Sequence, residues 1–170
     1  MQRVLVIGIP GAGKSTFSRK LAQRTGLPLI HLDKEFWQPG WKVTPREEWR
    51  PKVASLVARD AWVMDGNYDS SLDLRLPRAD MVVWFDYPRR VALPPVLLRV
   101  AKTYGRVRED LAPGCPEKID LEFLRYIWEF PHKERPRVVA SLAEHGKHLQ
   151  PFVFRRDRDV ARFLDGLPAT

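Results

Sequence analysis

Residues 8–16, GIPGAGKST, combine glycines, a lysine and hydroxyl side chains in a spacing suited to holding phosphate. They fit the pattern G-x-x-x-x-G-K-[ST] as Gly8, Gly13, Lys14 and Ser15. Successive backbone N–H groups of such a loop curl around an anion, and glycines let the chain approach it closely. Lys14 supplies a positive charge for the β and γ phosphates, and the Ser15 hydroxyl is a ligand for Mg²⁺. The pattern therefore predicts a site for a nucleoside triphosphate.

Three aspartates stand where strands are predicted to end, and ligands of parallel sheets gather at the carboxyl ends of the strands. Asp65, in WVMDGNY, is predicted to hold Mg²⁺ directly or through water, although Asp-Gly is also a common turn. Asp33, in HLD, is predicted to accept or orient the proton of a substrate hydroxyl; its structural alternative is an Asx-turn or a helix cap. Asp86 lies two residues before Pro88, a spacing that favours a helix N-cap over a catalytic role.

Arginines form the second group of candidates, because phosphoryl transfer depends on positioning and charge neutralisation, and guanidinium binds phosphate oxygens bidentately. Arg106 and Arg108 lie in segment 103–118, which carries glycines and prolines and has no clean period. We interpret this segment as a mobile flap whose arginines close over the phosphates; the alternative is a solvated loop. Arg156 follows the predicted fifth strand, where a nucleotide base would stack.

Aromatic and histidine side chains are weaker candidates. Phe36, Trp37 and Trp41 closely follow Asp33 and form either a flat pocket for a base or another ring, or simply part of the core. The histidines show no metal-ligand spacing and are assigned no catalytic role: His31, His132, His145 and His148.

Apolar strands alternating with helical patterns predict the α/β class: a three-layer P-loop NTPase fold with a five-stranded parallel sheet, like that of nucleoside and nucleotide kinases. The predicted strands are 2–8, 27–33, 61–66, 79–87 and 148–155. The predicted helices are 14–25, which Gly26 terminates, then 45–60, one that begins near Pro88, 119–130, 135–145 and 157–167. Pro94 and Pro95 are expected to kink or restart the third helix, and Pro131 and Pro136 to separate the next two.

Length and composition fit one domain over residues 1–170. No apolar stretch approaches the roughly 20 residues of a membrane span, and the start resembles neither a signal nor a transit peptide. Cys115 is the only cysteine, which excludes an internal disulfide and favours a reducing cytoplasm. The net charge of +8 is compatible with an anionic substrate, nucleic acid or an ordinary basic surface.

The segments HLDKEFWQPGW, WVMDGNYDSSLDLRLPRAD, VVWFDYP and GRVREDLAPGCPEK follow in an order that resembles the DNA topology modulation protein family, small kinases related to adenylate kinase. The resemblance covers nearly the whole chain. It implies a P-loop kinase fold and a flap that carries Arg108. The ATP contacts that it implies are Gly11, Ala12, Gly13, Lys14, Ser15 and Thr16. The family's name also implies an influence on DNA supercoiling.

Adenylate kinases carry an Asp-Gly-Phe-Pro-Arg run after the third strand, whose arginine grips the acceptor phosphate. Here the run is Asp65, Gly66, Asn67, Tyr68, and the next arginine is Arg75, which argues against AMP as the acceptor. Shikimate and gluconate kinases, also similar in outline, use an aspartate after the second strand near the acceptor hydroxyl, which Asp33 could match. No N-K-x-D motif is present, which argues against a GTPase.

Two functions are therefore expected from the sequence. The first is an ATP- and Mg²⁺-dependent kinase of a small-molecule acceptor, with Lys14, Asp33 and Arg108 as catalytic groups, Ser15 and Asp65 at the metal, and Arg106 and Arg156 at the nucleotide. The second is an ATP-gated nucleic-acid binder without kinase turnover, suggested by the basic charge and the family's name. The acceptor and the oligomeric state stay open.

Overall fold

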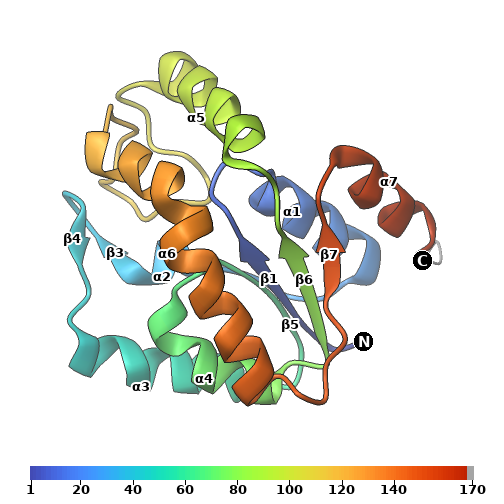
Figure 1. Cartoon of the computed structure of the whole chain (residues 1–170). Helices are drawn as coiled ribbons and strands as arrows, with labels where there is room; N and C mark the ends of the chain where they lie inside the picture. The colour runs from blue at the N-terminus through green and yellow to red at the C-terminus, as the bar shows by residue number, and fades with distance from the viewer. Residues whose placement is uncertain (168–170) are drawn as a thin grey trace.

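A computed structural model of the chain describes residues 1–167 and shows a parallel sheet between layers of helices (Figure 1). The sheet has five strands in the order β2-β5-β1-β6-β7, and all neighbours pair in parallel. Its strands are β1 (Arg3–Gly8), β2 (Leu29–His31), β5 (Trp62–Asp65), β6 (Met81–Phe85) and β7 (Phe152–Phe154). The α-helices are α1 (Lys14–Thr25), α2 (Leu32–Phe36), α3 (Arg46–Val57), α4 (Leu72–Arg75), α5 (Arg89–Thr103), α6 (Leu121–His145) and α7 (Asp157–Asp165).

Strand β1 lies at the centre of the sheet, and every one of its apolar side chains is buried. Val4 and Val6 face one hydrophobic cluster, shared with Phe17 and Leu21 of α1 and with α7. The alternate residues of β1 face a second cluster, formed with α3, α4 and part of α6. A strand covered on both faces reads as a continuous apolar run, as VLVIG does. The predicted five-stranded α/β fold is confirmed.

The helices differ from the prediction at their prolines. Residues 121–145 form one helix that contains Pro131 and Pro136, so the prediction of two separate helices was wrong. Helix α5 likewise runs through Pro94 and Pro95 without a restart. A proline removes only its own N–H bond and strains the preceding turn, and packing on both sides of such a helix can offset that cost. Buried residues before and after the prolines of α6, such as Ile127 and Val138, provide that packing.

Two other segments were not foreseen in detail. The aromatic loop after the second strand forms helix α2 and a two-stranded antiparallel hairpin, β3 (Trp37–Gln38) and β4 (Lys42–Val43). Between β5 and β6 the chain makes short helical turns, η1 (Asp69–Ser71), α4 and η2 (Leu76–Arg78). The fifth strand begins after Pro151 and lies at the edge of the sheet, where a proline is tolerated.

Backbone hydrogen bonds join the two ends of segment 103–118, which we call its neck, and another hydrogen bond holds its tip against the β3–β4 hairpin. The backbone of Glu117 donates to Arg106 O at 2.8 Å and accepts from Gly105 N at 2.8 Å. At the tip, Gly40 N of the hairpin donates to Gly114 O at 2.9 Å.

Within residues 1–167, no helix is long and apolar enough to span a membrane. The prediction of a single domain over residues 1–170 stays a prediction, and its last three residues lie outside those described.

Replacing Gly8 by alanine is expected to destabilise the chain by roughly 3 kcal/mol, from backbone strain and overpacking together. Gly8 has φ +127°, and a Cβ there would lie 2.2 Å from Phe85 O. Gly26→Ala is the matched control: Gly26 has φ +69° but open space around a Cβ, so only a strain of about 1 kcal/mol is expected. Urea unfolding of the two variants measures how much free energy of unfolding each one loses. Equal losses in Gly8→Ala and Gly26→Ala would contradict the close approach of β1 to β6.

Candidate functional site

The phosphate-binding pattern forms the connection between β1 and α1. Gly11 packs against α5, because a Cβ on it would lie 2.2 Å from Ala92 O. Gly13 has φ +87° and open space around it, and it precedes α1 with no side chain capping the helix. A helix N-terminus without a side-chain cap presents backbone N–H groups and the positive end of the helix dipole. The local structure therefore suits an anion at the start of α1.

Lys14 begins α1 and turns its ammonium back over the loop. Lys14 Nζ donates to Ile9 O at 2.9 Å. Burial lowers the pKa of Lys14, while the negative charges of Asp65 and Asp33 act in the opposite direction. Two of the three aspartates named from the sequence, Asp65 and Asp33, therefore lie close enough to Lys14 for their charges to act on it. This convergence is the central feature of the site.

Asp65 ends β5 beside β1, where it pairs in register with Val6. It is buried, and His31 Nδ1 lies 3.0 Å from Asp65 Oδ2, so the imidazole N–H donates to the carboxylate. Sequence spacing assigns His31 no catalytic role, because only the pairing of His31 with Asp65 across β2 and β5 brings the two side chains together. Positioning residues of this kind fix the direction in which a carboxylate presents its free oxygen.

Asp65 and Ser15, which the sequence nominates as metal ligands, fit Mg²⁺ by their chemistry. A carboxylate from Asp65 and a hydroxyl from Ser15 are the oxygen donors that Mg²⁺ prefers, and nucleotide phosphates and waters complete its shell. Within residues 1–167, no group of three or more His, Cys, Asp and Glu side chains is placed to hold a metal. A magnesium ion here would therefore depend on the nucleotide for most of its ligands.

Asp33 lies in the first turn of α2 rather than at the end of β2, which stops at His31. Tyr68 OH donates to Asp33 Oδ1 at 2.6 Å. Burial raises the pKa of Asp33, the Tyr68 hydrogen bond lowers it, and the charge of Asp65 raises it again. Asp33 is thus a partly buried carboxylate with one fixed donor, placed within electrostatic range of Lys14.

Arg75 is the arginine that stands nearest in sequence to the position of the acceptor-gripping arginine of adenylate kinases, and it is fully buried. Its guanidinium donates to Gly66 O at 2.9 Å and to Tyr68 O at 2.7 Å, and it also donates to Asn67 O. Burial lowers the pKa of Arg75 to about 9, so it remains cationic at neutral pH. Arg75 is therefore committed to the backbone of residues 66–68, and its guanidinium is not presented to a ligand.

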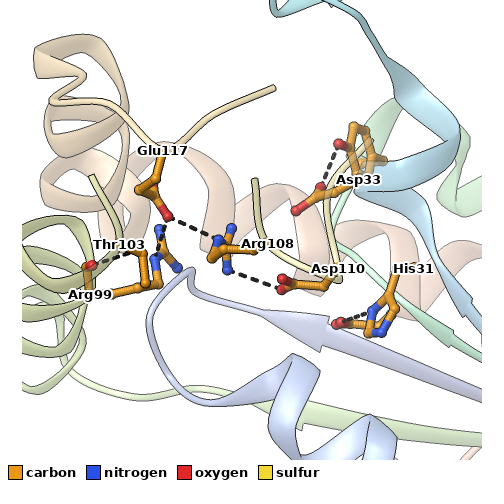
Figure 2. A network of polar contacts seen from close by, with 9 residues as sticks. His31, Asp33, Arg99, Thr103, Arg108, Asp110 and Glu117 are labelled. Atoms are coloured by element: carbon orange, nitrogen blue, oxygen red, sulfur yellow. Dashed lines mark hydrogen bonds and ion pairs between the residues drawn. The ribbon is translucent and has the colours of Figure 1, made fainter. Parts of the chain in front are cut away.

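The flap places Arg108 beside an arginine that the sequence analysis did not single out. Arg108 contacts Glu117 Oε2 at 2.9 Å and Asp110 Oδ2 at 3.1 Å, and Arg99 of α5 contacts the same Glu117 oxygen at 3.0 Å. Figure 2 shows Arg108 reaching Glu117 on one side and Asp110 on the other. The charge of Arg99 lowers the pKa of Lys14, which places Arg99 near the phosphate loop. Helical spacing explains this, since Arg99 lies one turn beyond Val96, which packs on Gly11.

Three other candidates have different surroundings. Arg106 is exposed at the neck of the flap. Arg156 is exposed at the start of α7 and contacts Asp159 at 3.3 Å. Asp86 does not cap α5, whose N-cap is Pro88 without a side-chain bond, so that prediction was wrong. Instead, Arg135 of α6 binds both carboxylate oxygens of Asp86 at 2.8 and 2.9 Å, which occupies them.

The aromatic residues that follow Asp33 pack mainly on one another. Phe36 makes edge-to-face contacts with Trp37 and Trp49, with ring centroids 5.2 and 5.0 Å apart. Trp41 Nε1 donates to Pro116 O at 2.9 Å, which ties the hairpin to the flap. Of the two alternatives from the sequence, the contacts favour a small aromatic core that supports Asp33 and the flap.

Two bacterial adenylate kinases are similar to part of the chain. The enzyme of Clavibacter michiganensis is 29% identical over 109 residues, 62% of this chain and 53% of the relative. That of Thermosipho melanesiensis is 29% identical over 106 residues, 61% of this chain and 48% of the relative. The matches therefore span about half the length of these relatives. No family model matches the chain, and the resemblance to DNA topology modulation proteins stays a prediction.

Two solved structures share the fold over almost the whole chain. A shikimate kinase of Bacteroides thetaiotaomicron superposes with a TM-score of 0.52 and 17% identity, covering 96% of both chains. A gluconokinase of Sinorhizobium meliloti superposes with a TM-score of 0.52 and 16% identity, covering 96% of this chain and 91% of the other. At such identities the likeness establishes the fold alone. The chain has the P-loop NTPase fold of small kinases.

Asp33→Asn is expected to stabilise the chain at neutral pH. Burial raises the pKa of Asp33, so the ionised form costs free energy in the folded state. For a raised carboxyl pKa, the stability contribution is present below the unfolded-state pKa and is lost as pH rises through the folded-state pKa. The gain from Asp33→Asn should therefore be largest at neutral pH and shrink on acidification.

Urea unfolding of Asp33→Asn and of the unaltered chain measures the difference between their free energies of unfolding. The measurement runs from about pH 4 to about pH 8, a range that spans ordinary and raised carboxyl pKa values. Asp60→Asn, on an exposed residue, serves as the control and should show no comparable dependence on pH. If the difference in free energy of unfolding between Asp33→Asn and the unaltered chain stays constant across this pH range, the raised pKa of Asp33 is contradicted.

Proposed function

We propose that this chain is an ATP-dependent phosphotransferase that moves the γ-phosphoryl group of ATP to a hydroxyl of a small molecule. The observation that carries the proposal is the convergence of Lys14, Asp65 and Asp33, whose charges act on one another at the carboxyl edge of the sheet. One positive group for the phosphates, one carboxylate for a metal and one for an acceptor are the parts that phosphoryl transfer needs. The kinase names of the relatives and the fold agree with this assignment.

Each residue has a distinct role in the proposed transfer. Backbone N–H groups at the start of α1 and the Lys14 ammonium hold the β and γ phosphates. Ser15 and Asp65 would hold Mg²⁺, which shields phosphate charge when it is bound. Asp33 accepts the hydroxyl proton as the acceptor oxygen bonds to the γ phosphorus and the bond from that phosphorus to the bridging oxygen breaks. The electrons of that bond leave with ADP.

The acceptor is proposed to be a hydroxyl compound without a phosphate at its reacting end. The carboxylate of Asp33 attracts a hydroxyl as a hydrogen-bond acceptor and repels a phosphate, since like charges oppose binding. Arg75, the next arginine after Asp65 along the chain, is fully buried against the backbone of residues 66–68. Both features separate this site from one that grips AMP. The catalytic contribution of Arg108 is proposed from its ion pair with Glu117, which also binds Arg99 beside the phosphate loop.

The ATP-gated nucleic-acid binder receives no support from the described residues. Among the basic side chains, Arg99 and Arg108 are ion-paired with Glu117, and Arg156 is ion-paired with Asp159. Paired arginines contribute less to an anionic surface than free ones. Binding of nucleic acid stays a prediction from the sequence.

An ATP-consumption screen of the full chain with Mg²⁺ tests the proposal, using nucleosides, nucleotides, sugars and hydroxy acids as acceptors. Lys14→Ala is expected to weaken ATP binding by about 10- to 100-fold, because it removes a charge-assisted bond to phosphate. Asp33→Asn is expected to keep ATP binding and to lower transfer by about 10²- to 10⁴-fold, the usual loss of a general base.

Lys20→Ala, on the exposed face of the same helix, is the matched control and should keep both binding and transfer. Transfer to an acceptor at an unchanged rate in both Lys14→Ala and Asp33→Asn would refute the assignment. A preference for nucleoside monophosphates over hydroxyl compounds would refute the proposed acceptor class.

A further inference from the structure

The three residues that follow β5, Gly66, Asn67 and Tyr68, connect the two halves of the proposed site. Asn67 Oδ1 accepts a hydrogen bond from Gly8 N, the first residue of the phosphate loop, at 3.3 Å. Tyr68 OH donates to Asp33 Oδ1 at 2.6 Å. One short segment therefore contacts the loop that would hold ATP and the carboxylate that would face the acceptor.

This segment is held in an unusual conformation. Tyr68 has φ +34°, which is uncommon for a residue with a side chain. A Cβ on Gly66 would lie 2.8 Å from Leu32 Cβ, so the segment presses against the start of α2. The buried guanidinium of Arg75 binds the carbonyl oxygens of all three residues. A strained backbone persists where the surroundings hold it from several sides, and such places gather at functional sites.

The ring and the hydroxyl of Tyr68 do different things. The ring packs on Phe36 and Trp49, with centroids 4.8 and 5.2 Å away. The hydroxyl makes the bond to Asp33, and burial followed by the charge of Asp33 raises the pKa of Tyr68, so the phenol keeps its proton. A phenylalanine would retain the packing and lose only the donor, which makes the two contributions separable.

We propose that Tyr68 is a positioning residue for Asp33: its hydroxyl holds the carboxylate in one orientation, so that the second carboxylate oxygen faces the acceptor beside the phosphate loop. This inference rests on the proposed function, because it gives Asp33 the acceptor's proton. An unsupported carboxylate rotates freely, and a geometry lost by even about 1 Å is costly in phosphoryl transfer. Arg75 also fixes the backbone of residues 66–68, and Asn67 bonds this segment to Gly8 of the phosphate loop.

Other charged groups also act on the Asp33 carboxylate and must stay unchanged in a test. They are Lys14 of α1, Asp65 of β5 and Asp110 of the flap. Tyr68→Phe alters none of them. The hydrogen bond from Tyr68 lowers the pKa of Asp33, so its removal should move the titration of Asp33 upward.

The experiment follows the carboxyl carbon of Asp33 by NMR during an acid titration of the full chain labelled with ¹³C-aspartate, the signal being assigned with Asp33→Asn. In Tyr68→Phe the pH at the titration midpoint of the Asp33 carboxyl group should rise. Turnover of Mg²⁺·ATP with water as acceptor, measured as phosphate release, should fall by about 10- to 100-fold in kcat, the usual size of a hydrogen bond to a charged group. KM for ATP should stay the same, because the phosphate loop is untouched.

Tyr87→Phe is the matched control, since Tyr87 OH donates a similar bond to another aspartate, Asp157 Oδ1, at 3.0 Å. It should leave the midpoint of Asp33 and the turnover unchanged. Incorporation of 3-fluorotyrosine into the unaltered sequence is a second measurement that does not depend on the folding of a variant. The more acidic phenol is a stronger donor, so the midpoint of Asp33 should fall.

The outcomes separate this inference from the proposed function. If Tyr68→Phe leaves both the midpoint and kcat unchanged while Asp33→Asn lowers kcat, the inference is overturned and the proposed function stands. If the midpoint moves but Asp33→Asn turns over as fast as the unaltered chain, the proposed role of Asp33 fails. A fall in kcat with an unmoved midpoint would reduce Tyr68 to a packing role and overturn the inference.

Discussion

The site depends on the enclosure of opposite charges in one small volume at the end of the sheet. Burial disfavours the charged forms of both Lys14 and Asp33, and each is partly compensated by the other; Asp65 also favours the charged form of Lys14 but opposes that of Asp33. Such groups are tolerated only if the backbone holds them in register, because an unpaired buried charge is strongly destabilising. The core of β1, packed on both faces, provides that fixed base. The same enclosure would strengthen the proposed interactions with phosphate, since water screens them less.

The remaining parts of the molecule fix the surroundings of this charge group. Helix α5 packs on Gly11 and brings Arg99 to the phosphate loop, while Glu117 joins Arg99 to Arg108 of the flap. On the side of Asp33, the aromatic hairpin supports α2 and is bonded to the flap through Trp41. The flap therefore contacts both α5, which packs on the phosphate loop, and the hairpin that follows α2, a position that under the proposed function would suit coupling of ATP binding to closure over the acceptor.

Much of the fold could be predicted because local pattern and tertiary structure agree there. Helix 14–25 and Gly26 were located correctly, and the apolar runs gave all five strands to within a few residues. Long-range contacts could not be read from local pattern. The prolines of α6 looked like breaks because their cost is local, whereas the packing that offsets it comes from distant residues. For the same reason, local pattern assigns no role to His31, Arg99 or Glu117. The cap predicted at Asp86 was wrong because Arg135, far along the chain, binds that carboxylate.

A structure of the full chain with Mg²⁺ and a non-hydrolysable ATP analogue would test the central claim most directly. The account predicts that the γ phosphate lies against Lys14 Nζ, which leaves its bond to Ile9 O, with Asp65 on the metal side. The Asp33 carboxylate, still bonded to Tyr68, should face the γ phosphorus with room for one hydroxyl between them. A triphosphate bound away from the loop after β1, or an Asp33 carboxylate turned away from it, would contradict the account.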